Sequence, residues 1–265
     1  MRRIVTAHVE ANVSSLADIT WSVAVSEAVP RAQEELTITV DGRPVEVEEI
    51  IDGMTRLHRC RETPAGALVL DYSCTVEEQA PEPDVTPLDE VAFLRPSRYV
   101  DSDTLAPVAL ATFGGKQGKQ LLDEVTTWVH QSLQYVSGSS RPTDGSIQTY
   151  LSRQGVCRDF AHLVIAMLRG LNVPARLVSV YAPGLSPMDF HAVAEALVDG
   201  KWQVVDATLL APRTSLLRIA TGRDASDTAF MTVTGGTVEL GQMEVTAVAE
   251  PDLPTDDPTM LTQLR

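Results

Sequence analysis

Residues 155–171 read GVCRDFAHLVIAMLRGL, and this stretch says most about the fold. Its apolar part, from Phe160 to Leu171, predicts a helix that ends before Pro174. Cys157 is therefore expected at the helix N-terminus. Unpaired N–H groups and the helix dipole there favour a thiolate, and the same N–H groups can receive a carbonyl oxygen that gains charge. Cys157 is thus a candidate nucleophile, and a buried structural cysteine at a helix start is the alternative.

A histidine and an aspartate follow on two predicted strands, at 192–198 and 201–206, joined by a turn at Asp199-Gly200. In that register Asp206 lies diagonally across from His191 on one face of the hairpin. Diagonal Cβ atoms are about 7–8 Å apart, which allows an imidazole–carboxylate hydrogen bond. A slip of one residue would remove this arrangement. An aspartate is unfavourable inside a strand, so we predict His191 as its partner, with a solvent-facing strand-end acid as the alternative.

Together these residues have the composition of a thiol acyl-transfer site. Such chemistry needs a thiolate, a base that takes its proton and a group that holds the base in the right tautomer. Cys157, His191 and Asp206 supply one of each, in that order along the chain. Asp159 is expected to stabilise the first helical turn. His162 lies about 140° around the helix from Cys157 and is expected to be packed rather than catalytic.

Composition limits the classes of function. The chain has 265 residues, 44% of them hydrophobic and 22% charged, which is typical of a globular protein. A net charge of −15 argues against nucleic acid or an anionic membrane as the main partner. The first residues, MRRIVTAH, turn polar too early for a secretory segment, and no apolar run approaches the roughly 20 residues of a membrane span. We expect a cytoplasmic protein, and its oligomeric state stays open.

The three cysteines do not suggest a disulfide framework. Cys60 and Cys74 lie in strand-like surroundings and are expected to be small buried hydrophobic residues, with a bridge between them as the alternative. Cys157, His191 and Asp206 lack a local pair of ligands at zinc-site spacing, so no metal is expected there. No calcium-binding loop pattern occurs, and no cofactor is indicated.

The chain divides by composition into four parts: an N-terminal β domain, a linker with three prolines, an α+β core and an acidic tail with further prolines. We predict a small β-sandwich for the first part. In the core we predict helices near 121–133, 147–153 and 160–171, and strands near 176–181, 192–198, 201–206, 229–234 and 237–248. The four parts span residues 1–80, 81–87, 88–249 and 250–265.

Several motifs together resemble the transglutaminase-like superfamily of cysteine enzymes, specifically its bacterial two-domain cysteine peptidases. The sequence GVCRDFAH at 155–162 is similar to the family's cysteine motif, HAVAE at 191–195 to its histidine motif, and DAT at 206–208 to its aspartate motif. RIATGRDASD at 218–227 resembles a further recurrent segment. Val193 departs from the pattern, because an aromatic residue commonly stands there. The likeness covers roughly residues 88–248.

This resemblance implies a papain-like core, in which a cysteine helix packs on an antiparallel sheet that carries the histidine and the aspartate. It implies that Cys157 is the nucleophile, His191 the base and then the acid, and Asp206 the orienting group. The family often adds a side-chain donor to the oxyanion site, for which Tyr135 and Gln154 are candidates. We expect a cysteine hydrolase acting on a peptide, amide or isopeptide bond of a peptide or protein substrate. The alternatives are an amine-accepting acyl transferase and a non-catalytic peptide-binding module.

Overall fold

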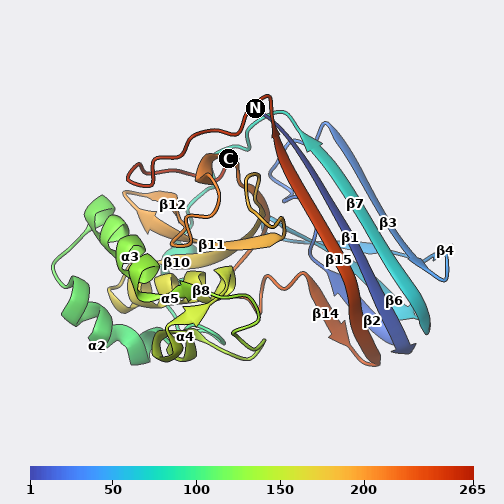
Figure 1. Ribbon diagram of the computed structural model, residues 1–265, viewed down its shortest axis with the longest axis horizontal. Coiled ribbons are helices and arrows are strands. Elements are labelled where there is room, and N and C mark those ends of the chain that lie inside the picture. Colours follow the sequence, from blue (N-terminus) through green and yellow to red (C-terminus); the bar gives the residue numbers. More distant parts are fainter.

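The computed structural model describes residues 1–265 and has the α+β organisation predicted from the sequence. Figure 1 shows helices against one side of a small central sheet and, beyond that sheet, a sandwich of long strands. The chain starts in the sandwich, builds the helices and the central sheet, and returns to the sandwich near its end. Both termini lie close together at the top of Figure 1, near the junction of the core and the sandwich, where Arg3 donates to the Arg265 carbonyl at 3.0 Å.

The sandwich consists of two antiparallel sheets. Its larger sheet has the order β15-β1-β7-β3-β4, and the smaller one β14-β2-β6-β5. Along β1 the side chains alternate between buried and less buried positions, as expected of a strand with one face on a core. The strands are β1 (Arg2–Ser15), β2 (Ala17–Trp21), β3 (Gln33–Val40), β4 (Arg43–Pro44), β5 (Glu48–Asp52), β6 (Thr55–Thr63), β7 (Gly66–Val76), β14 (Met231–Thr234) and β15 (Thr237–Glu250).

The structure corrects the expected membership of the last two strands. Residues 231–249 fall in the range predicted for the core, but β14 pairs with β2 and β15 pairs with β1 along nearly its whole length. The physical reason is that β1 is a central strand, with β7 on one side, and needs a second partner on the other. Alternation identifies a strand in the sequence, but it does not say which distant strand completes the hydrogen bonds.

The core combines five helices with the central sheet, whose order is β12-β11-β10-β13. Helix α5 is the central helix, and every residue from Asp159 to Arg169 is buried. The helices of the core are α1 (Pro87–Ala92), α2 (Ser102–Phe113), α3 (Gly118–Ser132), α4 (Ser146–Ser152) and α5 (Cys157–Gly170), with a 3-10 turn at Arg213–Ser215. Its strands are β10 (Ala175–Tyr181), β11 (Phe190–Val198), β12 (Lys201–Val205), β13 (Leu217–Gly222) and the short parallel pair β8 (Gln134–Tyr135) and β9 (Gln154–Gly155).

Helix α2 is absent from the sequence-based prediction. It contains Pro107, which removes one backbone hydrogen bond and argues against a helix on local grounds. The helix persists because Leu105, Ala109 and Phe113 are buried in the same hydrophobic cluster as α5. Tertiary packing therefore outweighs the local penalty.

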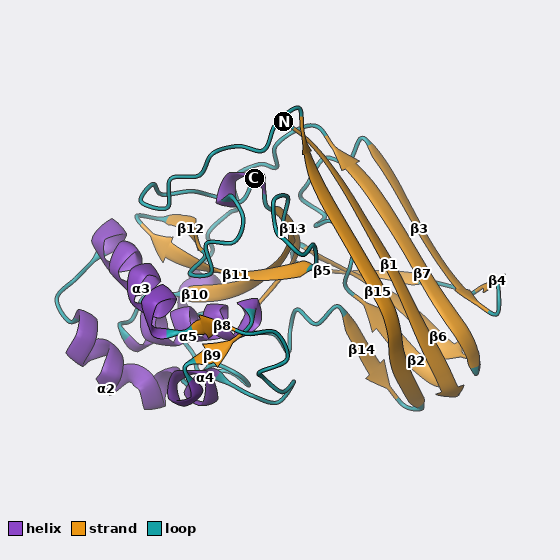
Figure 2. Ribbon diagram, viewed as in Figure 1, coloured by secondary structure: helices purple, strands orange, loops and turns teal.

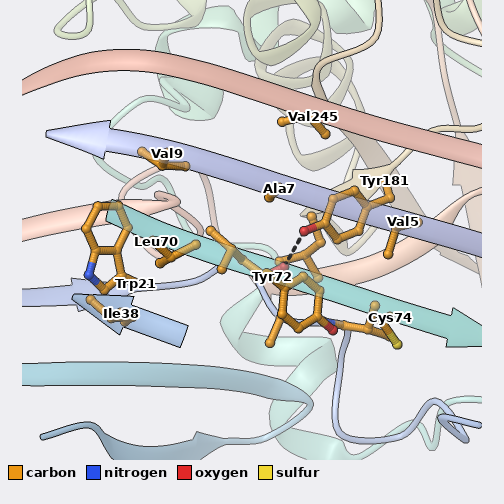
Figure 3. Packing of buried hydrophobic residues seen from close by; sticks show 14 of the residues in the cluster. Val5, Ala7, Val9, Trp21, Ile38, Leu70, Tyr72, Cys74, Tyr181 and Val245 are labelled. Carbon is orange, nitrogen blue, oxygen red and sulfur yellow. Dashed lines mark hydrogen bonds between the residues drawn. The ribbon is translucent and has the colours of Figure 1, made fainter. Parts of the chain in front are cut away.

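The sandwich and the central sheet share one hydrophobic core. Tyr181, at the end of β10, lies among the sandwich side chains and is fully buried (Figure 3). Its hydroxyl donates to the carbonyl of Val23 at 2.8 Å, and its ring stacks on Tyr72 with the ring centres 6.3 Å apart. Leu217 and Ile219 of β13 belong to the same cluster. The two parts are therefore held together by packing rather than by a flexible linker.

The C-terminal residues run back across the core. Asp256 forms an ion pair with Arg213 at 2.8 Å, and the N–H of Val204 donates to the carbonyl of Thr262 at 2.7 Å, so the tail lies beside the edge strand β12 of the central sheet. Leu264 is buried in a small hydrophobic cluster. No helix is long and apolar enough to cross a membrane.

Three buried charges tie strands of the central sheet together. Glu195 of β11 is fully buried and accepts from Arg176 of β10 at 2.7 Å and from Arg218 of β13 at 2.6 Å. The Arg176 guanidinium also lies 3.8 Å from the centre of the Trp202 ring. Burial raises the pKa of Glu195, but the two guanidinium groups lower it more, to about 2. Glu195 is therefore ionised at neutral pH.

We predict that Glu195→Gln destabilises the protein by about 3–5 kcal/mol, because it leaves two buried guanidinium groups without a counter-charge. Urea unfolding followed by circular dichroism measures this. The pKa of Glu195 is depressed in the folded state, so its contribution is present above the ordinary glutamate range and lost as the pH falls toward about 2. The Glu195→Gln variant should lack this part of the decrease in unfolding free energy at acid pH.

The matched control is Glu82→Gln, which removes the same charge from an exposed pair with Lys201, where the atoms are 3.1 Å apart. It should change the unfolding midpoint little, since exposed pairs are screened by solvent. Equal effects of the two substitutions would contradict the structural role given to Glu195.

Candidate active site

Cys157 is the first residue of α5, as predicted from the sequence. The turn before it is held by Asp159, whose buried carboxylate accepts from the Val156 N–H at 2.8 Å. A Cβ atom at Gly155 would lie 2.6 Å from the Cβ of Asp159, so only glycine fits there. The motif residues around Cys157 thus set the helix start, and Cys157 remains partly accessible with a free thiol.

His191 and Asp206 form a buried hydrogen-bonded pair. The hairpin has the predicted register, since Val198 pairs with Lys201 and Ala194 with Val205. His191 Nε2 lies 2.9 Å from Asp206 Oδ2. The other carboxylate oxygen, Oδ1, accepts from the Thr208 N–H at 2.8 Å and from its hydroxyl at 2.7 Å. Both oxygens are therefore occupied, and the carboxylate is fixed in one orientation.

The surroundings of His191 favour its protonated form. Burial lowers the pKa of His191, but the Asp206 carboxylate and, to a smaller extent, the Cys157 side chain raise it, to about 10. Burial likewise raises the pKa of Asp206, yet the His191 charge and the Thr208 donors bring it below its usual range. The Nδ1 atom of His191 is buried and has no hydrogen-bond partner. This leaves Nδ1 free for the thiol, whose proton it can accept.

Tyr135 lies beside Cys157. It pairs with Gly155 in the short β8–β9 ladder, and its ring contacts Phe160 with the ring centres 5.9 Å apart. Partial burial, followed by the negative charge of the Cys157 thiolate, raises the pKa of Tyr135 to about 12, while the Cys157 backbone N–H opposes this rise. The hydroxyl therefore lies close to both the thiol and that N–H. Both candidate donors are exposed, and the influence of Cys157 on its pKa places Tyr135 next to the thiol.

A second cluster lies beside the site, and the contacts that join His162 and Asp224 to Tyr99 and to the residues after Asp224 were not predicted from the sequence. His162 accepts from the Ala225 N–H at 3.1 Å and stacks on Tyr99, with the ring centres 5.5 Å apart. Burial lowers the pKa of His162 to about 3, so it is neutral and packed, as its helical position predicted. Asp224 accepts from the Tyr99 N–H at 2.8 Å and from the Ser226 N–H at 2.9 Å. The sequence signal for this turn is an aspartate followed two residues later by a serine.

A cavity of about 420 Å³ opens next to Cys157 and His191. Ten of its 16 lining residues are hydrophobic, among them Phe190, Phe230 and Met231. No group of three or more His, Cys, Asp or Glu side chains is arranged to hold a metal ion. Cys60 and Cys74 are buried with free thiols in the sandwich, far along the chain from this site. The arrangement can therefore bind an apolar group beside the Cys157 thiol and the His191–Asp206 pair.

Comparison with known proteins places this geometry in a family. The model of the transglutaminase-like superfamily matches residues 109–207, which include Cys157, His191 and Asp206. The crystal structure of a candidate cysteine protease from Cytophaga hutchinsonii superimposes with a TM-score of 0.85 and is 33% identical, covering 97% of this chain and 93% of that one.

Two mycobacterial relatives are also similar. An uncharacterised protein of Mycobacterium leprae is 25% identical over 193 residues, which are 63% of this chain and 67% of that protein. One of Mycobacterium tuberculosis is 37% identical over 62 residues, 23% of this chain and 20% of that protein. Since the Cytophaga protein matches in sequence and structure over nearly its whole length, the chain described here belongs to the transglutaminase-like superfamily.

Proposed function

We propose that this protein is a cysteine hydrolase that cleaves a peptide or amide bond of a peptide or protein substrate through a thioester on Cys157. The observation that carries the proposal is the buried His191–Asp206 pair with its free Nδ1 atom in the same cavity as the thiol. A raised pKa of His191, to about 10, favours a thiolate–imidazolium pair at neutral pH. Tyr135 and the Cys157 N–H supply an oxyanion site beside it.

The acylation step uses these groups in sequence. The Cys157 sulfur attacks the carbonyl carbon, and His191 Nδ1 holds the proton that the thiol has given up. The carbonyl oxygen becomes an oxyanion that accepts hydrogen bonds from the Cys157 N–H and the Tyr135 hydroxyl. The C–N bond then breaks, His191 gives its proton to the leaving nitrogen, and the acyl group remains on sulfur as a thioester.

Deacylation decides between hydrolysis and transfer. If water attacks the thioester, His191 accepts its proton, the C–S bond breaks, and a carboxylic acid leaves. An amine that reaches the thioester instead would give a new amide, which is the transferase alternative. The family membership covers both outcomes, and we favour hydrolysis because the similar Cytophaga protein is described as a candidate cysteine protease.

We predict that Cys157 reacts with iodoacetamide at pH values near 6–7, where a thiol without a nearby cation is mostly protonated and slow. Alkylation rates of each cysteine against pH, read by peptide mass spectrometry, measure this. Burial raises the pKa of Cys60 to about 11 and that of Cys74 above its usual range, so both thiols serve as internal unreactive controls. His191→Ala should slow the low-pH reaction of Cys157 by about tenfold or more.

Cys157→Ala should abolish turnover of peptide amides while leaving the unfolding midpoint nearly unchanged. If turnover persists in this variant, the proposed mechanism is wrong. If Cys157 instead titrates like an ordinary thiol and wild-type protein traps no acyl group, the peptide-binding alternative takes its place.

We predict that Asp206→Asn lowers kcat by about 10²–10⁴-fold with little change in KM, because the imidazolium loses its counter-charge and the ring loses its fixed tautomer. Steady-state kinetics with one peptide amide measure both parameters. Urea unfolding of the same variant is the control. A large loss of stability with kcat per folded molecule unchanged would show that Asp206 only supports the fold.

We predict that Tyr135→Phe lowers kcat by about 10²–10³-fold, as expected for the loss of one oxyanion donor. KM should change little, because the ring and its contact with Phe160 remain. Tyr150→Phe, which removes a hydroxyl from a partly buried tyrosine stacked on Trp128, is the matched control and should leave kcat unchanged. Equal kinetics of both variants would exclude Tyr135 from the oxyanion site.

A further inference from the structure

The cavity beside Cys157 is apolar along most of its wall. The rings of Phe190 and Phe230 stack with their centres 5.6 Å apart and an angle of 22° between them. Leu177 and Ile219 continue the wall, and both are almost completely buried. A volume of about 420 Å³ lies within the range of cavities that hold small organic groups. Binding of a large apolar side chain against this wall is favourable, because it removes apolar surface from water.

The charges near the cavity do not favour an ionic side chain. No aspartate or glutamate is among its lining residues, so a lysine or arginine side chain would find no counter-ion there. The one guanidinium group that lines it, that of Arg158, donates from Nη2 to the Arg141 carbonyl at 2.9 Å and lies 3.3 Å from the Asp159 carboxylate, while its Nε is buried without a hydrogen-bond partner. An acidic side chain would therefore have to share the Arg158 charge with the Asp159 carboxylate, and burying a charged side chain is costly.

The sandwich supplies one side of this cavity. Met231 is the first residue of β14, and Ser22 follows β2. The Ser22 N–H donates to the Phe230 carbonyl at 2.9 Å, which continues the β14–β2 pairing up to the cavity wall. Figure 2 shows β14 beside β2, reached by the loop that comes from the central sheet. The cavity is complete only because the chain returns to the sandwich after β13.

We propose that this cavity, closed by the sandwich through Phe230 and Met231, selects substrates with a bulky apolar side chain, such as leucine or phenylalanine, at the cleaved bond. This inference rests on the proposed function, because it takes the bond attacked by Cys157 as the reference point. It gives the sandwich a direct part in substrate selection. The shape and chemistry of the wall, rather than any charged group, provide the discrimination.

The test uses two series of acetylated peptide amides that vary one residue, either before or after the cleaved bond, among Phe, Leu, Ala, Gln, Lys and Glu. We expect kcat/KM for Phe and Leu to exceed that for Ala, Gln, Lys and Glu by about tenfold or more in one series. A flat profile in both series, or a preference for Gln, Lys or Glu, would overturn the inference.

A matched pair of variants then locates the selectivity. Met231→Ala removes a side chain from the cavity wall, whereas Met243→Ala removes the same side chain from β15, where it packs on the sandwich core outside the cavity. Met231→Ala should lower the ratio of kcat/KM for Phe over Ala peptides several-fold. Met243→Ala should leave this ratio at the wild-type value. If the ratio is the same in both variants, the sandwich wall does not select the substrate.

Binding to Cys157→Ala separates this inference from the proposed function. The dissociation constants of the same peptides are measured with this variant by calorimetry. Selective binding of Phe and Leu peptides without any turnover by wild-type protein would support the cavity inference and refute the hydrolase. Turnover of peptides without side-chain preference would support the hydrolase and refute the cavity inference.

Discussion

The candidate active site and the stability of the central sheet both depend on the register in which β11 pairs with its neighbouring strands. His191, Val193 and Glu195 share one face of β11, because strand side chains alternate. The turn at Asp199-Gly200, where both residues have positive φ, fixes β12 so that Asp206 reaches His191. The same register places Glu195 opposite Arg176. A slip of one residue would separate the proposed base from its carboxylate and bury Glu195 without its partners, so the folded register is strongly favoured.

The sandwich packs directly against the core. Tyr181 lies in the sandwich core, β14 and β15 return to its sheets, and Arg3 of β1 donates to the carbonyl of Arg265 at 3.0 Å. Residues near both ends of the chain therefore contact each other and the sandwich. Because the wall of the cavity beside Cys157 includes Met231 of β14, movement of the sandwich would change the shape of the cavity. A rigid junction is the arrangement expected when both parts shape one binding site.

Local patterns in the sequence were sufficient for some of this structure and insufficient for the rest. The helix at Cys157, the hairpin and the His191–Asp206 pair follow from helix signals, a two-residue turn and alternation, which act over short distances. The partners of β14 and β15 depend on contacts with residues far away in the chain, and alternation does not identify them. Helix α2 exists despite Pro107 because of packing, and sequence position alone did not distinguish Tyr135 from Gln154 as neighbours of the thiol.

The electrostatics of the site also fit the two opposite roles proposed for His191. With a free thiolate, both Asp206 and Cys157 raise the pKa of His191, so the imidazole holds its proton firmly. Once sulfur has bonded to the carbonyl carbon, the thiolate charge on sulfur is gone, and Asp206 remains to offset the burial that lowers this pKa. The imidazolium then becomes a stronger acid at the stage when the leaving nitrogen needs its proton. After the amine has left, the same less basic imidazole can accept a proton from water, and loss of the acyl group restores the thiolate and the original pair.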